Sequence, residues 1–201
     1  MAEFEALSKA MSAWFKSKAK AAREAPPPKP FSGVGVYLTS EVHSACSAQG
    51  YFAPQKLVEA LASILGYQLA IIEEKGGIIE QFVGDVVIAY WMPADLPSLL
   101  ATVRATTTRI IREKVKIADL DFRLRLNFCA AEMAGAFFGP ESGRRFQVIG
   151  RARDRTAALP RFSPGVDCVF TDAETVAAMP ADTRAAFVAH SPAVFSLKLP
   201  S

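Results

Sequence analysis

Residues 76–91 of the chain read Gly-Gly-Ile-Ile-Glu-Gln-Phe-Val-Gly-Asp-Val-Val-Ile-Ala-Tyr-Trp. Two apolar runs rich in β-branched residues flank the Gly84-Asp85 pair, which is a strong signal for a β-hairpin with a two-residue turn. Both runs are almost continuously hydrophobic, so we expect the hairpin in a sheet covered on at least one face. Asp85 then presents a carboxylate from a rigid turn. This is either ordinary turn chemistry or the presentation of a charge to a metal ion or phosphate.

The length and composition indicate one sizeable domain with an appendage. The chain has 201 residues, 51% of them hydrophobic, which supports a large core. No apolar run reaches the roughly 18 residues that span a bilayer, and no secretory signal pattern is visible. The three cysteines, Cys46, Cys129 and Cys168, are widely spaced in apolar surroundings. We therefore expect a reduced, cytoplasmic protein without a zinc or disulfide framework.

The net charge of +3 is unevenly distributed. Residues 1–30 carry six Lys and Arg against three Glu, which accounts for the whole excess. The rest of the chain is neutral, so its composition gives no argument for nucleic-acid binding, and we expect no nucleic-acid partner.

Residues 3–24 predict an amphipathic basic helix with apolar side chains at spacings of three and four, including Phe4, Leu7, Met11 and Trp14. The proline-rich stretch 25–30 ends this helix as a stiff, extended linker. We therefore divide the chain into 1–30 and a main domain at 31–201. The apolar stripe needs a partner, which is either a protein surface or a membrane surface.

The main domain shows an alternating order of strands and helices. A strand at 34–38 continues towards 42, Pro54 starts a long helix that Gly76 and Gly77 end, and the hairpin follows. Further elements are expected as a helix at 98–114, strands at 122–128, 133–138 and 146–150, a helix at 152–159, a strand at 167–171, a small helix near 172–178 and a strand at 194–199. This order predicts an α+β fold with a ferredoxin-like β-α-β-β-α-β core and extra C-terminal strands and helices.

Several segments, taken in order, resemble the catalytic domain of class III nucleotidyl cyclases. Gln-Phe-Val-Gly-Asp at 81–85 is similar to the Lys-Phe-Ile-Gly-Asp hairpin of that family, and Arg-Leu-Asn-Phe-Cys-Ala-Ala-Glu at 125–132 is similar to its Arg-Ile-Gly-Ile-His-x-Gly-Glu strand. Phe-Gln-Val-Ile-Gly-Arg-Ala-Arg-Asp at 146–154, with Thr-Ala-Ala-Leu at 156–159, resembles Tyr-x-Val-Ile-Gly-Asp-x-Val-Asn followed by Ala-Ala-Arg-Leu. The resemblance covers about residues 34–180.

The resemblance implies a head-to-tail dimer with active sites at the subunit interface. Two aspartates of the family bind two divalent ions, usually Mg²⁺ or Mn²⁺, which polarise the triphosphate of ATP or GTP and activate the 3′-hydroxyl. A lysine with an aspartate or threonine selects the base, an asparagine orients the ribose, and an arginine neutralises charge on the phosphates.

The metal and base positions are partly altered in this sequence. Asp85 keeps the second metal position, and the first falls on Glu41 or on Ser40, depending on how the strand is aligned. The nucleotide-binding positions are Gln81, which replaces the base-selecting lysine, with Phe82, Gly84 and Gln147 or Val148.

The catalytic positions are altered as well, because the asparagine position is Asp154 and the arginine position is Ala158. Arg151, Arg153 and Arg155 crowd the same segment, either as a solvated helix face or as displaced phosphate contacts. We therefore predict a catalytically impaired cyclase-homology domain that acts as a nucleotide-binding, regulatory or dimerisation module. The alternatives are an active adenylate or guanylate cyclase, alone or in a heterodimer, and a scaffold with an empty pocket.

Overall fold

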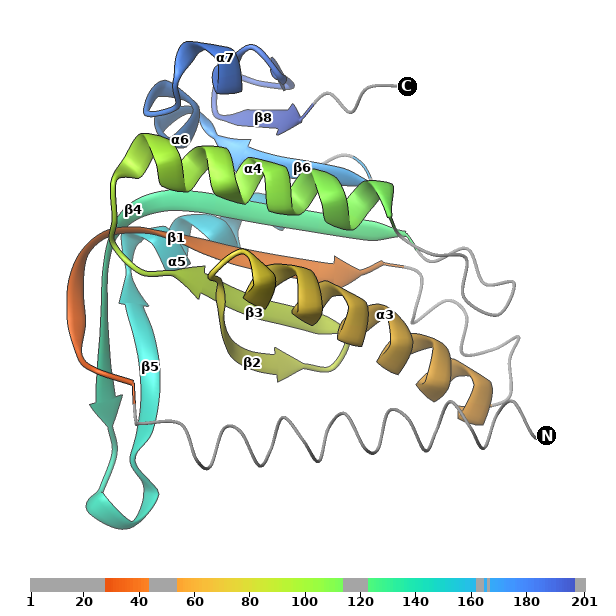
Figure 1. The fold of residues 1–201 in the computed structure, drawn as a ribbon, viewed down its shortest axis with the longest axis vertical. Helices are drawn as coiled ribbons and strands as arrows, with labels where there is room; N and C mark the ends of the chain where they lie inside the picture. Colours follow the sequence, from red (N-terminus) through yellow and green to blue (C-terminus); the bar gives the residue numbers. More distant parts are fainter. Residues whose placement is uncertain (1–27, 44–53, 114–122, 162–164, 166, 198–201) are drawn as a thin grey trace.

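The computed structural model describes residues 28–43, 54–113, 123–161, 165 and 167–197 of the chain. Eight strands form one mixed sheet with the order β2-β3-β1-β4-β6-β8-β7, and β5 pairs with β4 (Figure 1). The strands are β1 Phe31–Val42, β2 Ile78–Val83, β3 Val86–Trp91, β4 Leu124–Phe138, β5 Arg145–Gly150, β6 Cys168–Asp172, β7 Phe187–Ala189 and β8 Val194–Leu197. The helices are α3 Pro54–Glu74, α4 Leu96–Arg112, α5 Arg151–Ala158, α6 Ala173–Ala177 and α7 Ala181–Arg184, with 3₁₀ turns η1 Glu141–Gly143 and η2 Leu159–Arg161.

The sheet is covered on both faces in its middle. Helices α3 and α4 lie on one face and α5 lies on the other (Figure 1). Val36, Leu38 and Val42 of β1 are buried in the core under α3 and α4, whereas Tyr37 packs with Ala152 of α5. This alternation of side chains along β1 assigns each residue of the strand to one face or the other.

The predicted α+β order is confirmed, since β1, α3, β2, β3, α4 and β4 follow one another as the β-α-β-β-α-β core. Three details differ from the prediction. The segments 122–128 and 133–138 belong to a single 15-residue strand, β4, and the hairpin strand β2 is an edge strand with mostly exposed side chains. The short elements α7 and β7 have no counterpart among the predicted ones.

The predicted helix at 3–24 lies outside the described residues, so the division into 1–30 and 31–201 stays a prediction. In the part of the chain that the structure describes, no helix is both long and apolar enough to cross a bilayer.

The end of β5 fixes where α5 begins. Gly150 joins the two elements with φ of 125°, a backbone conformation that side-chain-bearing residues rarely adopt. A Cβ at this position would lie 2.7 Å from the carbonyl oxygen of Glu132 on β4. Only glycine fits this close approach. Because Gly150 stands here, β5 stays paired with β4 up to its last residue and α5 begins at the next one.

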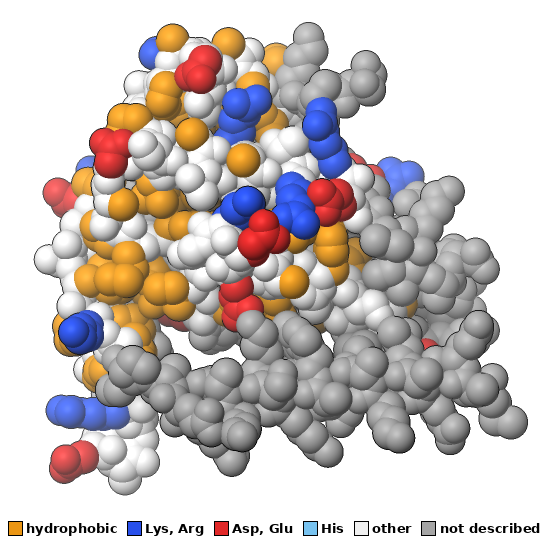
Figure 2. Space-filling model, in the orientation of Figure 1, with side chains coloured by type: hydrophobic (Ala, Val, Ile, Leu, Met, Phe, Trp, Pro, Cys, Tyr) orange, Lys and Arg blue, Asp and Glu red, His pale blue; other side chains and the backbone are white. Residues whose placement is uncertain are grey.

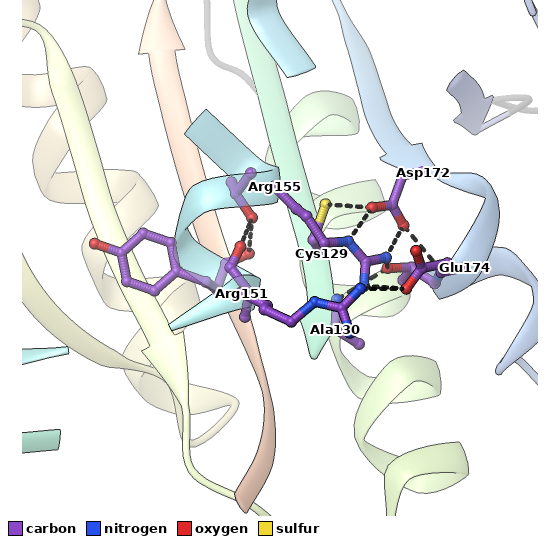
Figure 3. A network of polar contacts seen from close by, with 10 residues as sticks. Cys129, Ala130, Arg151, Arg155, Asp172 and Glu174 are labelled. Carbon is purple, nitrogen blue, oxygen red and sulfur yellow. Dashed lines mark hydrogen bonds and ion pairs between the residues drawn. The ribbon is translucent and has the colours of Figure 1, made fainter. Parts of the chain in front are cut away.

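A network of polar contacts fastens α5 to β6 and α6 (Figure 3). The Arg155 guanidinium donates to both carboxylate oxygens of Asp172, each at 2.5 Å, and to Glu174 at 2.7 Å. Asp172 also caps α6 by accepting the Thr175 N–H at 2.9 Å. The side chains of Arg155 and Asp172 are only 18% and 17% exposed. The pair is therefore much better shielded from solvent than an ordinary surface salt bridge.

The network holds two groups in defined protonation states. Burial alone would raise the pKa of Asp172, but hydrogen bonds from Arg155 and Thr175 and the charge of Arg155 together hold this pKa below its usual range. Burial, and then the charge of Asp172, raise the pKa of the Cys129 thiol, whose Sγ lies 3.3 Å from a carboxylate oxygen of Asp172. Cys129 is therefore a protonated donor to Asp172.

We expect Asp172→Asn to lower the free energy of unfolding at pH 7 by about 1–3 kcal/mol, between the values for exposed and fully buried ion pairs. Because the pKa of Asp172 is lowered in the folded state, its contribution is present above its unfolded pKa of about 4 and is lost as the pH falls through the folded-state pKa. Urea denaturation from pH 7 downwards measures this difference. Glu174→Gln is the matched control, since Glu174 is 65% exposed and a surface pair contributes at most about 1 kcal/mol. A deficit for Asp172→Asn that persists at the lowest pH would contradict the electrostatic explanation.

Candidate functional site

The two faces of the sheet differ in the charged side chains and predicted site residues that they carry. Charged side chains of both signs are interspersed over α4 (Figure 2), where Arg109 pairs with Glu74 at 2.7 Å and with Glu113 at 3.0 Å. Of the predicted site residues, Ser40 lies on this face, buried beneath α3. Phe82 of β2 is paired with Val87, a core residue of the same face. Glu41 and Gln81 lie on the α5 face, and Asp154 and Ala158 belong to α5 itself.

A cavity of about 330 Å³ lies between the hairpin, β5 and α5. Its lining comprises Glu80 and Gln81 of β2, Arg145, Phe146 and Gln147 of β5, and Arg153 of α5. The structure thus brings together Gln81 and Gln147, which lie 66 positions apart in the numbering and were both predicted as nucleotide-binding residues. Amide and guanidinium groups in one cavity can donate to and accept from a planar polar ligand.

Glu80 organises the wall of this cavity. The pairing of β2 with β3 shifts register between Ile79 and Gln81, so Glu80 lies at a bulge. Its carboxylate accepts the Tyr37 hydroxyl at 2.5 Å and the Val148 N–H at 2.9 Å. Burial first, and then the hydrogen bond to Glu80, raise the pKa of Tyr37. One side chain therefore ties β2 to β1 and β5.

Both the N–H and the carbonyl oxygen of Val148 are hydrogen-bonded to side chains. Its N–H is donated to Glu80, and its carbonyl oxygen accepts the Arg153 guanidinium at 3.0 Å. The Val148 side chain is buried, whereas Gln147 lines the cavity. Of the two positions that the sequence left open for the partner of Gln81, Gln147 is the one with access to the cavity.

The hairpin turn lies beside the end of β1. Gly84 has φ of 63°, as a tight turn requires, and Phe82 is exposed on the edge strand, outside the cavity lining. Asp85 is the second residue of the turn and is half-buried, and its carbonyl oxygen accepts the Val42 N–H at 3.2 Å. The predicted metal position on the hairpin is thus adjacent to the strand that carries Ser40 and Glu41.

Ser40 and Glu41 point to opposite faces of β1. Ser40 is fully buried on the face covered by α3, where its hydroxyl donates to the Gln68 side chain. Glu41 lies on the α5 face, and one of its oxygens accepts two N–H groups of Arg125, at 3.0 and 3.3 Å. Of the two residues, Glu41 is the one on the α5 face, together with Gln81.

The donor set does not fit a centre for two divalent ions. Ser40 is turned into the core, Glu41 is paired with a guanidinium, and Asp85 is the remaining carboxylate of the predicted set. Throughout the described ranges, no group of three or more His, Cys, Asp and Glu side chains is placed to hold a metal ion. Hard cations such as Mg²⁺ need several oxygen ligands at short distances, and the predicted residues do not converge to supply them.

Helix α5 carries Asp154 and Ala158, the two residues that the sequence predicts at altered catalytic positions. Asp154 is exposed on its outer side and Ala158 is partly buried, and neither lines the cavity. The three arginines of this segment are not the uniformly solvated face considered from the sequence. Arg155 is held by Asp172 and Glu174, Arg153 by the Val148 carbonyl, and Arg151 reaches Glu174 at 3.4 Å. Arg155 and Arg153 therefore connect α5 to its neighbours, whereas the Arg151 contact is between two exposed side chains.

Sequence reasoning missed three residues that shape the site. Glu80 interrupts an otherwise apolar run, and Arg125 stands in an alternating strand, but the partners of both are distant in the chain. Asp172 was assigned only to the start of a small helix, and nothing local points to Arg155 as its partner. One signal was available in the sequence. A charged residue on a strand face that is expected to be buried needs a partner of opposite charge or a hydrogen-bond partner.

No family model matches the sequence, and no curated protein sequence matches it. Solved structures match closely in fold. The adenylyl cyclase CyaB from P. aeruginosa is 14% identical with a TM-score of 0.66, over 85% of this chain and 96% of that one. A bacterial light-regulated adenylyl cyclase is 14% identical with a TM-score of 0.71, over 99% of this chain and 66% of that one.

A guanylate cyclase domain shows the same likeness. The domain of RhGC from Catenaria anguillulae, solved in complex with GTP, is 10% identical with a TM-score of 0.68, over 87% of this chain and all of that one. With the core order, the hairpin and the β5–α5 junction described above, these matches establish that the chain has the fold of the catalytic domain of class III adenylyl and guanylyl cyclases.

Proposed function

We propose that the chain is a cyclase-homology domain in signalling that binds a nucleotide, pairs with a second cyclase-type domain and is catalytically impaired as a homodimer. The observation that carries the proposal is α5. Asp154 and Ala158 stand there where the resemblance expects an asparagine and an arginine, so a negative charge and a methyl group replace an amide and a cation. Loss of a single transition-state donor typically costs about 10²–10³ in rate.

Nucleotide binding is supported by the cavity. Gln81 and Gln147 both line it, and Arg145 and Arg153 add positive charge beside them. The related Catenaria domain has been solved in complex with GTP. Amides can pair with the edge of a purine in either orientation, so these two glutamines favour a nucleobase without selecting adenine over guanine.

Pairing with a second domain is supported by exposed apolar side chains on one part of the molecule. β5 and the end of β4 extend away from the helices as an arm (Figure 1). Phe137, Phe138 and Ile149 of the arm are large and exposed, and Val34 of β1 is exposed as well. Exposed apolar side chains gathered in this way mark interaction surfaces.

An active cyclase, alone or in a heterodimer, is the second candidate. A homodimer brings together two copies of the same altered positions, whereas a partner that supplies the asparagine and arginine could complement Glu41 and Asp85 of this chain. Co-purification with such a partner, followed by an activity assay of the pair, separates the two candidates.

We expect the purified chain to form no cyclic nucleotide from ATP or GTP with Mn²⁺ above the level of its Asp85→Ala variant. The reason is the combined loss of an amide and a cation at Asp154 and Ala158. Chromatographic detection of the cyclic product over hours measures this. Steady formation that Asp85→Ala abolishes would show an active enzyme and would sink the proposed impairment.

We expect ATP or GTP with Mg²⁺ to stabilise the chain against thermal unfolding, because a ligand of the folded state adds about 2.7 kcal/mol at 100 times its Kd. Gln81→Ala should weaken the apparent Kd by about 3–10-fold, the effect of one hydrogen bond. Arg104→Gln, on α4 at the other face of the sheet, is the control and should leave the Kd unchanged. An unchanged thermal midpoint at millimolar nucleotide would favour the scaffold with an empty cavity.

We expect the chain to associate through the arm, and Phe138→Asp to weaken this association at least about tenfold by placing a charge in an apolar contact. Sedimentation velocity over a concentration series measures the dissociation constant. Val188→Asp on β7, at the far edge of the sheet, is the matched control because Val188 is similarly exposed. If both variants dissociate like the original chain, the interface lies elsewhere.

A further inference from the structure

Glu41 and Arg125 are brought together by strand register. β1 and β4 pair antiparallel over 12 positions, and Glu41 lies directly opposite Arg125. Their neighbours Val42, Leu124 and Leu126 are buried in the core under α3 and α4, so the two charged side chains share the opposite face. Directly opposed residues have Cβ atoms within about 5.5 Å, which makes this contact a consequence of the pairing itself.

The contact is bidentate from the arginine side and partly shielded. Arg125 Nη2 and Nε lie 3.0 and 3.3 Å from the same oxygen, Glu41 Oε2. The side chains are 14% exposed for Arg125 and 31% exposed for Glu41. Arg125 Nη2 is also 3.3 Å from His43 Nδ1, which adds a third side chain on the same edge. A charge-assisted pair in such surroundings is stronger than an exposed one.

The same carboxylate cannot serve a guanidinium and a divalent ion equally well. An ion such as Mg²⁺ or Mn²⁺ needs a carboxylate oxygen at close range, and a fixed guanidinium beside that oxygen would repel it. Ser40, the neighbouring residue, is turned away into the core. Both Arg125 contacts are to Glu41 Oε2, so a cation at this carboxylate would lie beside a fixed positive charge whichever oxygen it used.

We propose that Arg125 is the resident counter-ion of Glu41 and keeps this carboxylate from binding a divalent cation. This inference rests on the proposed function in one respect: it takes Glu41 of β1 as the first of the two metal positions that the resemblance to cyclases implies. In this view, the guanidinium of Arg125 itself is the cation that Glu41 holds, and it takes the place of a divalent ion. Asp85 is left without a second carboxylate from β1.

The test is the affinity of the full chain for Mn²⁺, measured without nucleotide from the electron paramagnetic resonance signal of free Mn²⁺. We expect Arg125→Met to tighten Mn²⁺ binding at least about tenfold, because it frees Glu41, and the double variant Glu41→Gln/Arg125→Met to lose that gain. In the original chain, Glu41→Gln alone should leave Mn²⁺ binding unchanged. Arg104→Met, on the other face of the sheet, is the matched control and should also bind as the original chain does.

Two results would overturn the inference. One is a folded Arg125→Met variant that binds Mn²⁺ no better than the original chain, and the other is weaker Mn²⁺ binding on Glu41→Gln in the original chain. If Arg125→Met fails to fold, Arg125→Gln replaces it, since an amide can still donate to Glu41 without a charge. Cyclic nucleotide formation by the original chain would overturn the proposed function, whereas unchanged Mn²⁺ affinity on removal of Arg125 would overturn only this inference.

Discussion

The structure depends on the pairing of β1 between β3 and β4. β1 is bonded to β4 from Phe31 to Val42 and to β3 from Val36 to Glu41. A strand paired on both sides cannot shift, because a slip of one residue would turn its core side chains to the wrong face. This constraint sends Ser40 into the core and Glu41 to the α5 face, and it brings the hairpin turn to the end of the strand.

The order of the core elements could be predicted because it depends on local patterns. The helix from Pro54 to Glu74, the Gly84 turn and the step from β5 into α5 each carry their signal within a few residues. The length of β4 was missed, because its middle is rich in small residues with little strand preference and its pairing with β1 and β5 decides the outcome. The exposed edge position of β2 likewise depends on the order of the sheet.

The candidate site was predictable in position but not in chemistry. The hairpin and the β5–α5 segment indicated where the residues lie, whereas their hydrogen-bond partners are distant in the chain. The Ser40 hydroxyl donates a hydrogen bond to Gln68, Glu41 accepts one from Arg125, and Glu80 accepts one from Tyr37. Polar groups satisfied within the chain have less to offer a ligand, since binding must first break an existing bond. An alignment of positions does not show which polar side chains are already hydrogen-bonded within the chain.

The continuity of β4 has a consequence for how this domain can diverge. Its 15 residues have a path length of about 50 Å at the usual rise of a strand, and they join the Arg125 edge of the site to the tip of the arm. Inserting or deleting one residue between them would exchange the two faces for every position beyond the change. We expect descendants of this sequence to alter the composition of β4 freely at exposed positions, yet to preserve its length.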